Sequence, residues 1–224
     1  MTRNNEPLTG VWQDWGFRLN LKLVLYLQSS VFNRKNKASQ IPNLAKRRDV
    51  SGNPKKKNEM EDKILNTYEE LLKFSDSILN LESPIIDSRI EDFENKIEYK
   101  LPKDFKYFIK KNNGFSLSVT EVYGIGKELL NSSLDEIYDF EHNEVGNPMP
   151  KYFLPFSPDG YGNHYCIDLS RIENEICPIV FWQHDCNYEN ISEVETCNKN
   201  FVEWINEVMI EWTLGEYNFD GTEK

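Results

Sequence analysis

From residue 60 onward the hydrophobic periodicity of this chain changes twice, and the order of the changes restricts the possible folds. Between residues 60 and 114, apolar residues recur every three to four positions, the spacing of amphipathic helices. Runs rich in β-branched and aromatic residues follow at 118–125, 152–158, 163–170 and 177–185, which predicts at least four strands. A last helical stripe begins near residue 201. The short gaps between strands leave little room for parallel crossovers. We therefore expect an α+β fold with an antiparallel or mixed sheet, flanked by N-terminal helices and a C-terminal amphipathic helix.

Residues at the helix ends refine this prediction. Pro84 should end the first helix, Asp87 or Ser88 should cap the second, and Pro102 suits the first turn of the third. Asn198 should cap the last helix, and residues 133–143 predict a further helix over one face of the sheet. The expected apolar faces, in chain order, are Ile64, Leu65, Tyr68, Leu71, Leu72, Ser75, Ile78 and Leu79; Ile90, Phe93, Glu94 and Ile97; Phe105, Phe108 and Ile109; and Phe201, Trp204, Ile205, Val208, Met209 and Trp212.

Charge divides the chain in two. Residues 1–59 hold 12 Lys and Arg against 4 Asp and Glu, a net charge of +8, whereas residues 60–224 hold 14 against 33, a net charge of −19. The sign changes at the Gly, Pro and lysine run of residues 52–60, which predicts a boundary there. We expect a basic N-terminal extension (1–59) and an acidic domain (60–224).

The extension carries one strand-like pattern, in which Phe17 and the leucines at alternate positions from 19 to 27 could form one buried face. Three explanations compete for it. The segment adds to a sheet edge of the acidic part, it is a remnant of another protein, or translation begins at Met60. We expect the extension to be disordered or the result of a misassigned start.

Other features argue against export and membrane insertion. No run of about 18 apolar residues could form a spanning helix, and no secretory signal is evident, so we expect a cytoplasmic protein that does not bind membranes. The cysteines, Cys166, Cys177, Cys186 and Cys197, form no Cys-x-x-Cys pair, which favours free thiols packed as small apolar residues over a zinc site.

The stretch Asp159-Gly160-Tyr161-Gly162-Asn163 admits two interpretations. Glycines beside Asp and Asn occur in phosphate loops, but such a loop runs from a strand into a helix. Here the following residues, 164–170, have strand character. A hairpin is therefore favoured, since Gly tolerates positive φ and Asp and Asn bond to nearby backbone.

The remaining catalytic possibilities are weak. His142, His164 and His184 could join Asp159, Asp168 or Asp185 around a metal, but no pair has close ligand spacing. Cys166 with His184 would need an exposed thiolate, whereas Cys166 alternates with residues typical of a strand core. We expect His164 and His184 to be hydrogen-bonded residues at strand ends, and neither enzyme activity, cofactor nor metal.

Four motifs in order carry a family resemblance. They are "LPKDF" continuing to Asn113-Gly114, "PFSPDGYGNHYCIDL", "IVFWQHD" and "FVEWINE". Together they resemble the SMI1/KNR4 family of the SUKH superfamily over residues 85–207, and the resemblance implies a SUKH-like α+β fold.

The resemblance also implies two functions. Bacterial members are immunity proteins that bind and mask polymorphic toxins, often nucleases, whereas fungal members are regarded as intracellular regulatory scaffolds. The acidic charge would repel nucleic acid and attract a basic toxin domain. An immunity protein is therefore the first hypothesis and a regulatory scaffold the alternative. Nothing in the sequence specifies an oligomeric state.

Partner contacts are expected around the hairpin, with exposed aromatics as anchors and acids as a complementary rim. The predicted binding residues are Tyr123, Asp159, Tyr161, Asn163, His164, Trp182 and Asp185.

Overall fold

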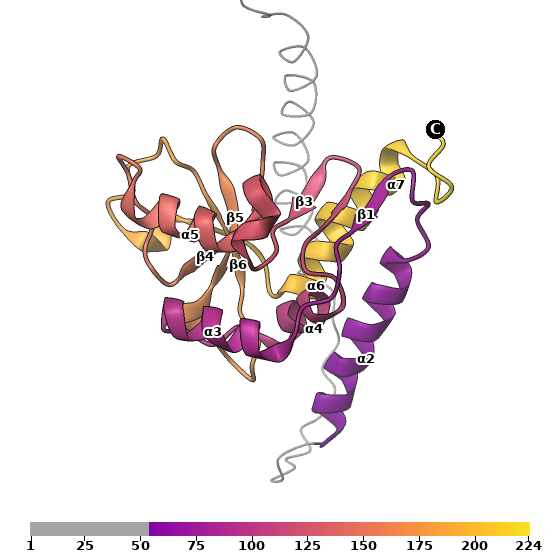
Figure 1. Cartoon of the computed structure of the whole chain (residues 1–224), viewed down its shortest axis with the longest axis horizontal. Coiled ribbons are helices and arrows are strands. Elements are labelled where there is room, and N and C mark those ends of the chain that lie inside the picture. Colours follow the sequence, from indigo (N-terminus) through magenta and orange to yellow (C-terminus); the bar gives the residue numbers. More distant parts are fainter. Residues whose placement is uncertain (1–53) are drawn as a thin grey trace, which may run out of the picture. The chain divides into compact units, whose positions relative to one another are not determined.

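The computed structural model describes residues 54–224, and the fold is given for these residues (Figure 1). The strand-like pattern at 17–27 and nearly all of the basic extension lie outside them. The helices are α2 (Pro54–Leu71), α3 (Asp87–Ile97), α4 (Lys103–Lys111), α5 (Leu134–Asn143), α6 (Phe201–Trp204) and α7 (Trp212–Glu216), with a π-helical segment η4 (Ile205–Glu211) joining the last two and short 3₁₀ turns η1 (Lys127–Ser132), η2 (Leu169–Arg171) and η3 (Ile191–Glu193). The strands are β1 (Leu79–Leu81), β2 (Phe115–Leu117), β3 (Thr120–Val122), β4 (Phe153–Pro158), β5 (His164–Asp168), β6 (Ile179–Trp182) and β7 (Glu195–Asn198).

The strands form two antiparallel sheets, β1-β2-β3 and β4-β5-β6-β7, which confirms the predicted α+β class. The Tyr123 amide donates to Phe156 O at 2.9 Å, so the sheets adjoin where the chain leaves β3 beside β4. One strand was expected over 118–125, but the hairpin β2–β3 occupies 115–122 and turns at Ser118, whose φ is +53°. Strand β7 was not predicted, because its residues do not alternate clearly between polar and apolar.

The first helix is shorter than expected. It ends at Leu71, and Leu79 begins β1, which pairs with β2 through Leu79 opposite Leu117. The predicted helical positions Leu72, Ser75, Ile78 and Leu79 are therefore outside the helix. Backbone pairing with β2 buries Leu79, whereas Leu65 and Leu72 of the predicted face are largely exposed.

The other helical faces are confirmed. α3 buries Ile90, Phe93, Glu94 and Ile97, and α4 buries Phe105, Phe108 and Ile109. The caps differ from prediction: Ile86 precedes α3 without a side-chain cap bond, and Asn200, rather than Asn198, caps α6 by accepting from the Glu203 amide at 2.9 Å.

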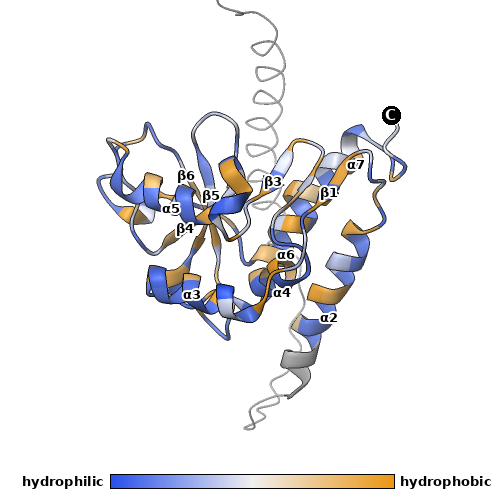
Figure 2. Cartoon of the chain, viewed as in Figure 1, coloured by the Kyte–Doolittle hydropathy of each residue, from blue (hydrophilic) through white to orange (hydrophobic). Residues whose placement is uncertain are grey.

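The four-stranded sheet is buried on both faces. One face contributes Leu154, Phe156 and Tyr165 to the main core, where the α6–η4 helix and α4 pack. The opposite face forms a second, smaller core of Met149, Phe153, Cys166, Val180, Trp182 and Val194. In Figure 2 the central strands and α6 are coloured mainly as hydrophobic, whereas α3 and α5 show both colours. Because both faces are covered, strands β4 to β6 are almost continuously apolar.

A buried carboxylate connects α4 to the C-terminal helix. Asp104 is fully buried, and its Oδ2 accepts from the Phe201 amide at 2.9 Å, at the start of α6. The rings of Phe105 and Phe108 pack edge-on against Phe201, with centroids 5.0 and 5.4 Å apart. Burial raises the pKa of Asp104 to about 6, against the opposing effect of the backbone amides that it accepts from.

Glu94 is a second buried acid, held by cations. Lys100 and Lys106 donate to its two oxygens at 2.7 and 3.0 Å, and the Leu101 amide donates at 2.9 Å. Burial alone would raise the pKa of Glu94, but these donors outweigh it and the net shift is downward. The charged groups thus fix the turn between α3 and α4.

We predict that Asp104→Ala lowers the free energy of unfolding by about 2 kcal/mol, because it leaves buried amides at the start of α6 without an acceptor. The effect should depend on pH. Because the pKa of Asp104 is higher in the folded than in the unfolded protein, the folded protein binds this proton more tightly. The contribution of Asp104 to the free energy of unfolding is therefore largest below the unfolded pKa and declines as pH rises through about 6.

The loss should therefore be greater at about pH 4.5 than at about pH 7.5, measured by urea unfolding of both proteins. Asp92→Ala, which removes an exposed acid on α3, is the control. A loss that grew as pH rose would show that the carboxylate is not destabilised by burial.

Candidate functional site

The segment Asp159 to Asn163 is a hairpin loop between β4 and β5. Gly160 and Gly162 have φ values of +82° and +89°, which glycine adopts without strain. Asp159 Oδ1 accepts from the amides of Tyr161 (2.7 Å) and Asn163 (3.0 Å). The chain continues into β5 and not into a helix, so the hairpin interpretation is confirmed and the amides do not form a phosphate loop.

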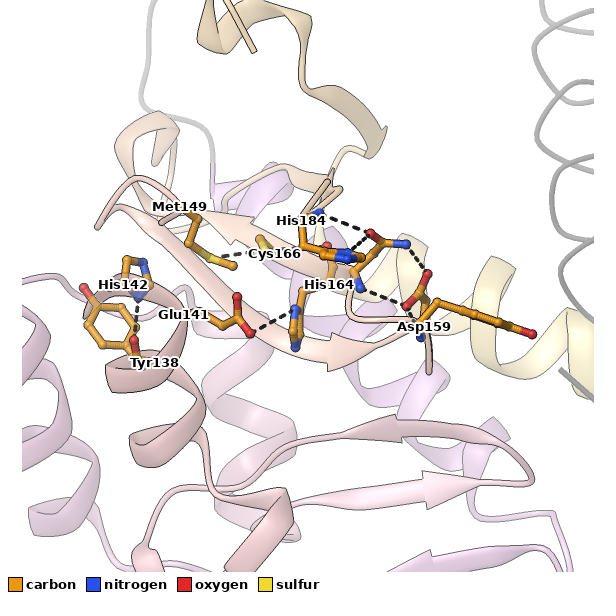
Figure 3. A network of polar contacts seen from close by, with 10 residues as sticks. Tyr138, Glu141, His142, Met149, Asp159, His164, Cys166 and His184 are labelled. Atoms are coloured by element: carbon orange, nitrogen blue, oxygen red, sulfur yellow. Dashed lines mark hydrogen bonds and ion pairs between the residues drawn. The ribbon is translucent and has the colours of Figure 1, made fainter. Parts of the chain in front are cut away.

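Asn163 ties this hairpin to the loop that follows β6. Its Nδ2 donates to Asp159 Oδ2 at 2.6 Å, while its Oδ1 accepts from the His184 amide at 3.2 Å and lies 3.0 Å from His184 Nδ1 (Figure 3). Gly162 lies directly against this histidine, since a Cβ there would be 3.1 Å from Nδ1. The hairpin and the post-β6 loop are thus held together by side-chain bonds.

A third segment joins them. Asn147, in the connection between α5 and β4, donates from Nδ2 to His184 O at 3.1 Å and to Cys186 O at 2.9 Å. We call residues 159–163, residues 183–190 and Asn147 the loop platform. It lies at the end of the sheet where β4, β5 and β6 meet these loops.

Beneath the platform lies a buried pair of titratable groups. His164 of β5 and Glu141 of α5 are both buried, with Nδ1 and Oε1 4.0 Å apart. Burial lowers the pKa of His164 to about 4 and raises that of Glu141. His164 is therefore neutral at neutral pH and the contact is not an ion pair. Within the described residues, His164 Nδ1 has no hydrogen-bond partner. The expectation that His164 is a hydrogen-bonded residue at a strand end was therefore wrong for this atom.

Two predicted aromatic anchors are not exposed. Tyr123 is 5% and Trp182 is 4% exposed. Trp182 packs against Phe153 and Tyr188 in the second core, and Tyr123 lies beside His164 with ring centroids 6.3 Å apart. Residues from other segments of the chain cover both rings, which sequence spacing did not show. Neither ring can serve as an exposed anchor in this conformation.

The other predicted residues meet at the platform. Tyr161 is 42% exposed and Asp185 is exposed, whereas Asp159 and Asn163 are half-buried and use their side chains to hold the loops. Their role in binding a partner stays a prediction. Asn147 and His184 were not among the predicted binding residues, although His184 stands next to Asp185 at the end of the predicted strand 177–185. Long-range hydrogen bonds join His184 to Asn147 and Asn163, and a single sequence does not reveal such contacts.

The burial of the cysteines and the contacts of His142 are those of residues that support the fold. Cys166 and Cys177 are buried, which raises the pKa of both thiols, and Cys186 and Cys197 are partly exposed. No disulfide joins any of the four within the part of the chain that the structure describes. His142 contacts the Tyr138 and Pro150 carbonyl oxygens at 2.6 and 3.1 Å. Across residues 54–224, no three His, Cys, Asp or Glu side chains are grouped as metal ligands would be. Nor does this part of the chain contain a helix with the length and apolar character needed to cross a membrane.

Comparison with known proteins identifies a family and shows similarity to solved structures. The sequence matches the SMI1 / KNR4 family (SUKH-1) over residues 84–207. A solved protein from Pseudomonas syringae pv. tomato is similar with 15% identity and a TM-score of 0.44, covering 67% of this chain and 98% of its own. No curated protein matches the chain.

The contact between Gly162 and His184 yields a prediction. Gly160→Ala should cost about 1 kcal/mol, because alanine is strained at positive φ but its Cβ would meet no atom within 4 Å. Gly162→Ala carries the same strain and must also displace the His184 ring, so it should cost roughly twice as much. Thermal unfolding of both variants, with Gly162→Ala/His184→Ala as a third, checks this. Equal losses for the two single variants would show that the ring does not lie on Gly162.

Proposed function

This chain belongs to the SMI1/KNR4 family (SUKH-1), and we propose that it is an immunity protein that neutralises a basic toxin domain by binding it. The toxin would be a nuclease type, whose phosphate-binding cleft is cationic, and the complex would form in the cytoplasm. The protein would act without turnover, by covering the active site of the toxin.

The observation that carries this proposal is the uneven distribution of charge. Residues 128–198, which form η1, α5, β4 to β7 and the loop platform, hold 14 acidic and 2 basic residues, a net charge of −12. Residues 60–127 hold 13 acidic and 10 basic residues, a net charge of −3. The half of the domain that carries the platform therefore has the greater potential to attract a basic protein.

The platform also has the properties of a preformed binding surface. Its loops are cross-linked by Asn163 and Asn147, so little conformational entropy would be lost on binding. Tyr161 presents an exposed aromatic ring at the tip, and aromatic residues often dominate binding energy at interfaces. Exposed acids on the same loops, among them Asp185, would form the rim.

The titratable residues support a function without catalysis. Among the described residues, each histidine is bonded within the fold or buried, and the two most buried thiols have raised pKa values, so neither would supply a thiolate nucleophile. A toxin would be masked by shape and charge complementarity.

Co-expression tests this function. The toxin would be the C-terminal domain of a large secreted protein encoded beside this chain, induced in a sensitive host with and without the full chain. We expect growth to be restored and the two proteins to purify as a stable complex. Folded protein that neither restores growth nor forms a complex would contradict the proposal and favour a regulatory scaffold.

Neutralising acidic residues near the platform gives a second test. Asp185→Asn/Glu189→Gln/Glu193→Gln should slow association with the toxin domain about tenfold at low salt, because it weakens steering near the platform. Glu61→Gln/Asp62→Asn/Glu69→Gln removes the same charge from exposed positions of α2 and should have a much smaller effect. Stopped-flow rates at low and high salt measure both. Equal slowing by the two triple variants would show that only net charge matters.

A further inference from the structure

The loop platform fixes the tautomer of one exposed histidine. Asn163 Nδ2 donates to Asp159 Oδ2, and a carboxylate can only accept, so Asn163 Oδ1 is the atom that faces His184. This oxygen accepts from the His184 amide and lies 3.0 Å from Nδ1. Nδ1 must therefore carry a proton. In the neutral imidazole, Nε2 is then left as a hydrogen-bond acceptor.

That acceptor is available to a partner. Within residues 54–224, no hydrogen bond is made to His184 Nε2, and the side chain is exposed. The ring is also held in place, because Nδ1 bonds to Asn163 while Gly162 lies so close that a Cβ there would be 3.2 Å from Cε1. A fixed ring with an open acceptor loses little freedom when it forms an intermolecular bond.

Two other exposed residues are chain neighbours of this contact. Tyr161, 42% exposed, precedes Gly162, and Asp185 follows His184 in the chain with its carboxylate exposed. Asp159 is not available in the same way, because both of its carboxylate oxygens accept bonds within the loop. The two loops that Asn163 joins thus carry an exposed aromatic residue, an exposed carboxylate and an imidazole nitrogen that can accept a hydrogen bond.

These three groups suit a guanidinium better than an ammonium. A guanidinium is planar, donates five hydrogen bonds in a fixed geometry and stacks on aromatic rings, whereas an ammonium is a compact and strongly hydrated charge. We propose that Tyr161, His184 and Asp185 form a receptor for an arginine side chain of the partner, with His184 Nε2 accepting one of its hydrogen bonds. The inference rests on the proposed function in that the arginine would belong to the basic toxin domain.

Peptide probes test the receptor without the toxin. The isotopically labelled full chain is titrated with hexa-arginine and with hexa-lysine, followed by amide chemical shifts. We expect shifts centred on residues 159–163 and 183–185, and tighter binding of hexa-arginine by about threefold or more. Shifts spread over the acids of α2 and the C-terminal helix, or equal affinity for both peptides, would overturn the proposal.

His184 variants separate contact from positioning. His184→Asn keeps a donor where Nδ1 bonds to Asn163 but lacks Nε2, so it should bind hexa-arginine about five- to tenfold more weakly with an unchanged melting temperature. Asn95→Ala, which changes an exposed neutral residue of α3 outside the loop platform, is the control. Unchanged affinity in His184→Asn would show that the imidazole only positions the loops.

The tautomer is measurable in the unmodified chain. A long-range proton–nitrogen spectrum of the histidine rings should show His184 protonated at Nδ1, and protonation at Nε2 alone would overturn the assignment. The outcomes are independent of the proposed function. Hexa-arginine binding at the platform without a toxin complex would contradict only the proposed function, whereas a toxin complex that His184→Asn leaves unchanged would contradict only the arginine receptor.

Discussion

The carboxylate of Asp104 joins two helix starts that are 97 residues apart in the chain. Its bond to the Phe201 amide sets α6 against α4, and the aromatic rings of Phe105, Phe108, Phe156 and Phe201 then fill the space between these helices and the sheet. Burial of a carboxylate is unfavourable, and the raised pKa of Asp104 reflects that cost. The hydrogen bonds it accepts offset the cost, so this polar contact determines how the apolar layers meet.

The position of the platform follows from this arrangement. With the main core on one face of the four-stranded sheet, the α5–β4 connection and the segment after β6 cover the other face, where Met149, Tyr188 and Val194 pack around Trp182 and Cys166. The loops that cover this second core emerge beside the β4–β5 hairpin, where Asn147 and Asn163 bind them together. A surface made of three separate segments therefore behaves as one unit, and its residues owe their geometry to side-chain bonds and not to regular secondary structure.

Much of the fold was predictable from the sequence because local signals agreed with the tertiary structure. The apolar spacing of α3, α4 and the C-terminal helix matches the buried faces, and the glycines of the β4–β5 loop predicted its hairpin. Predictions failed where distant contacts override local patterns. Leu79 continues a helical spacing but pairs with Leu117 of β2, and Trp182 has the sequence position of an exposed anchor but is covered by residues from other segments.

The sequence by itself determined the α+β class, the family resemblance, the hairpin and the concentration of acidic residues, because each depends on residues that are close in the chain or on composition alone. The tertiary structure decided which of the candidate residues reach solvent and which are bonded to one another. Tyr161 and Asp185 are exposed, Tyr123 and Trp182 are not, and the bond between Asn163 and His184 spans 21 positions. Such contacts are set by how sheets and loops pack, and side-chain burial and tautomer follow from that packing.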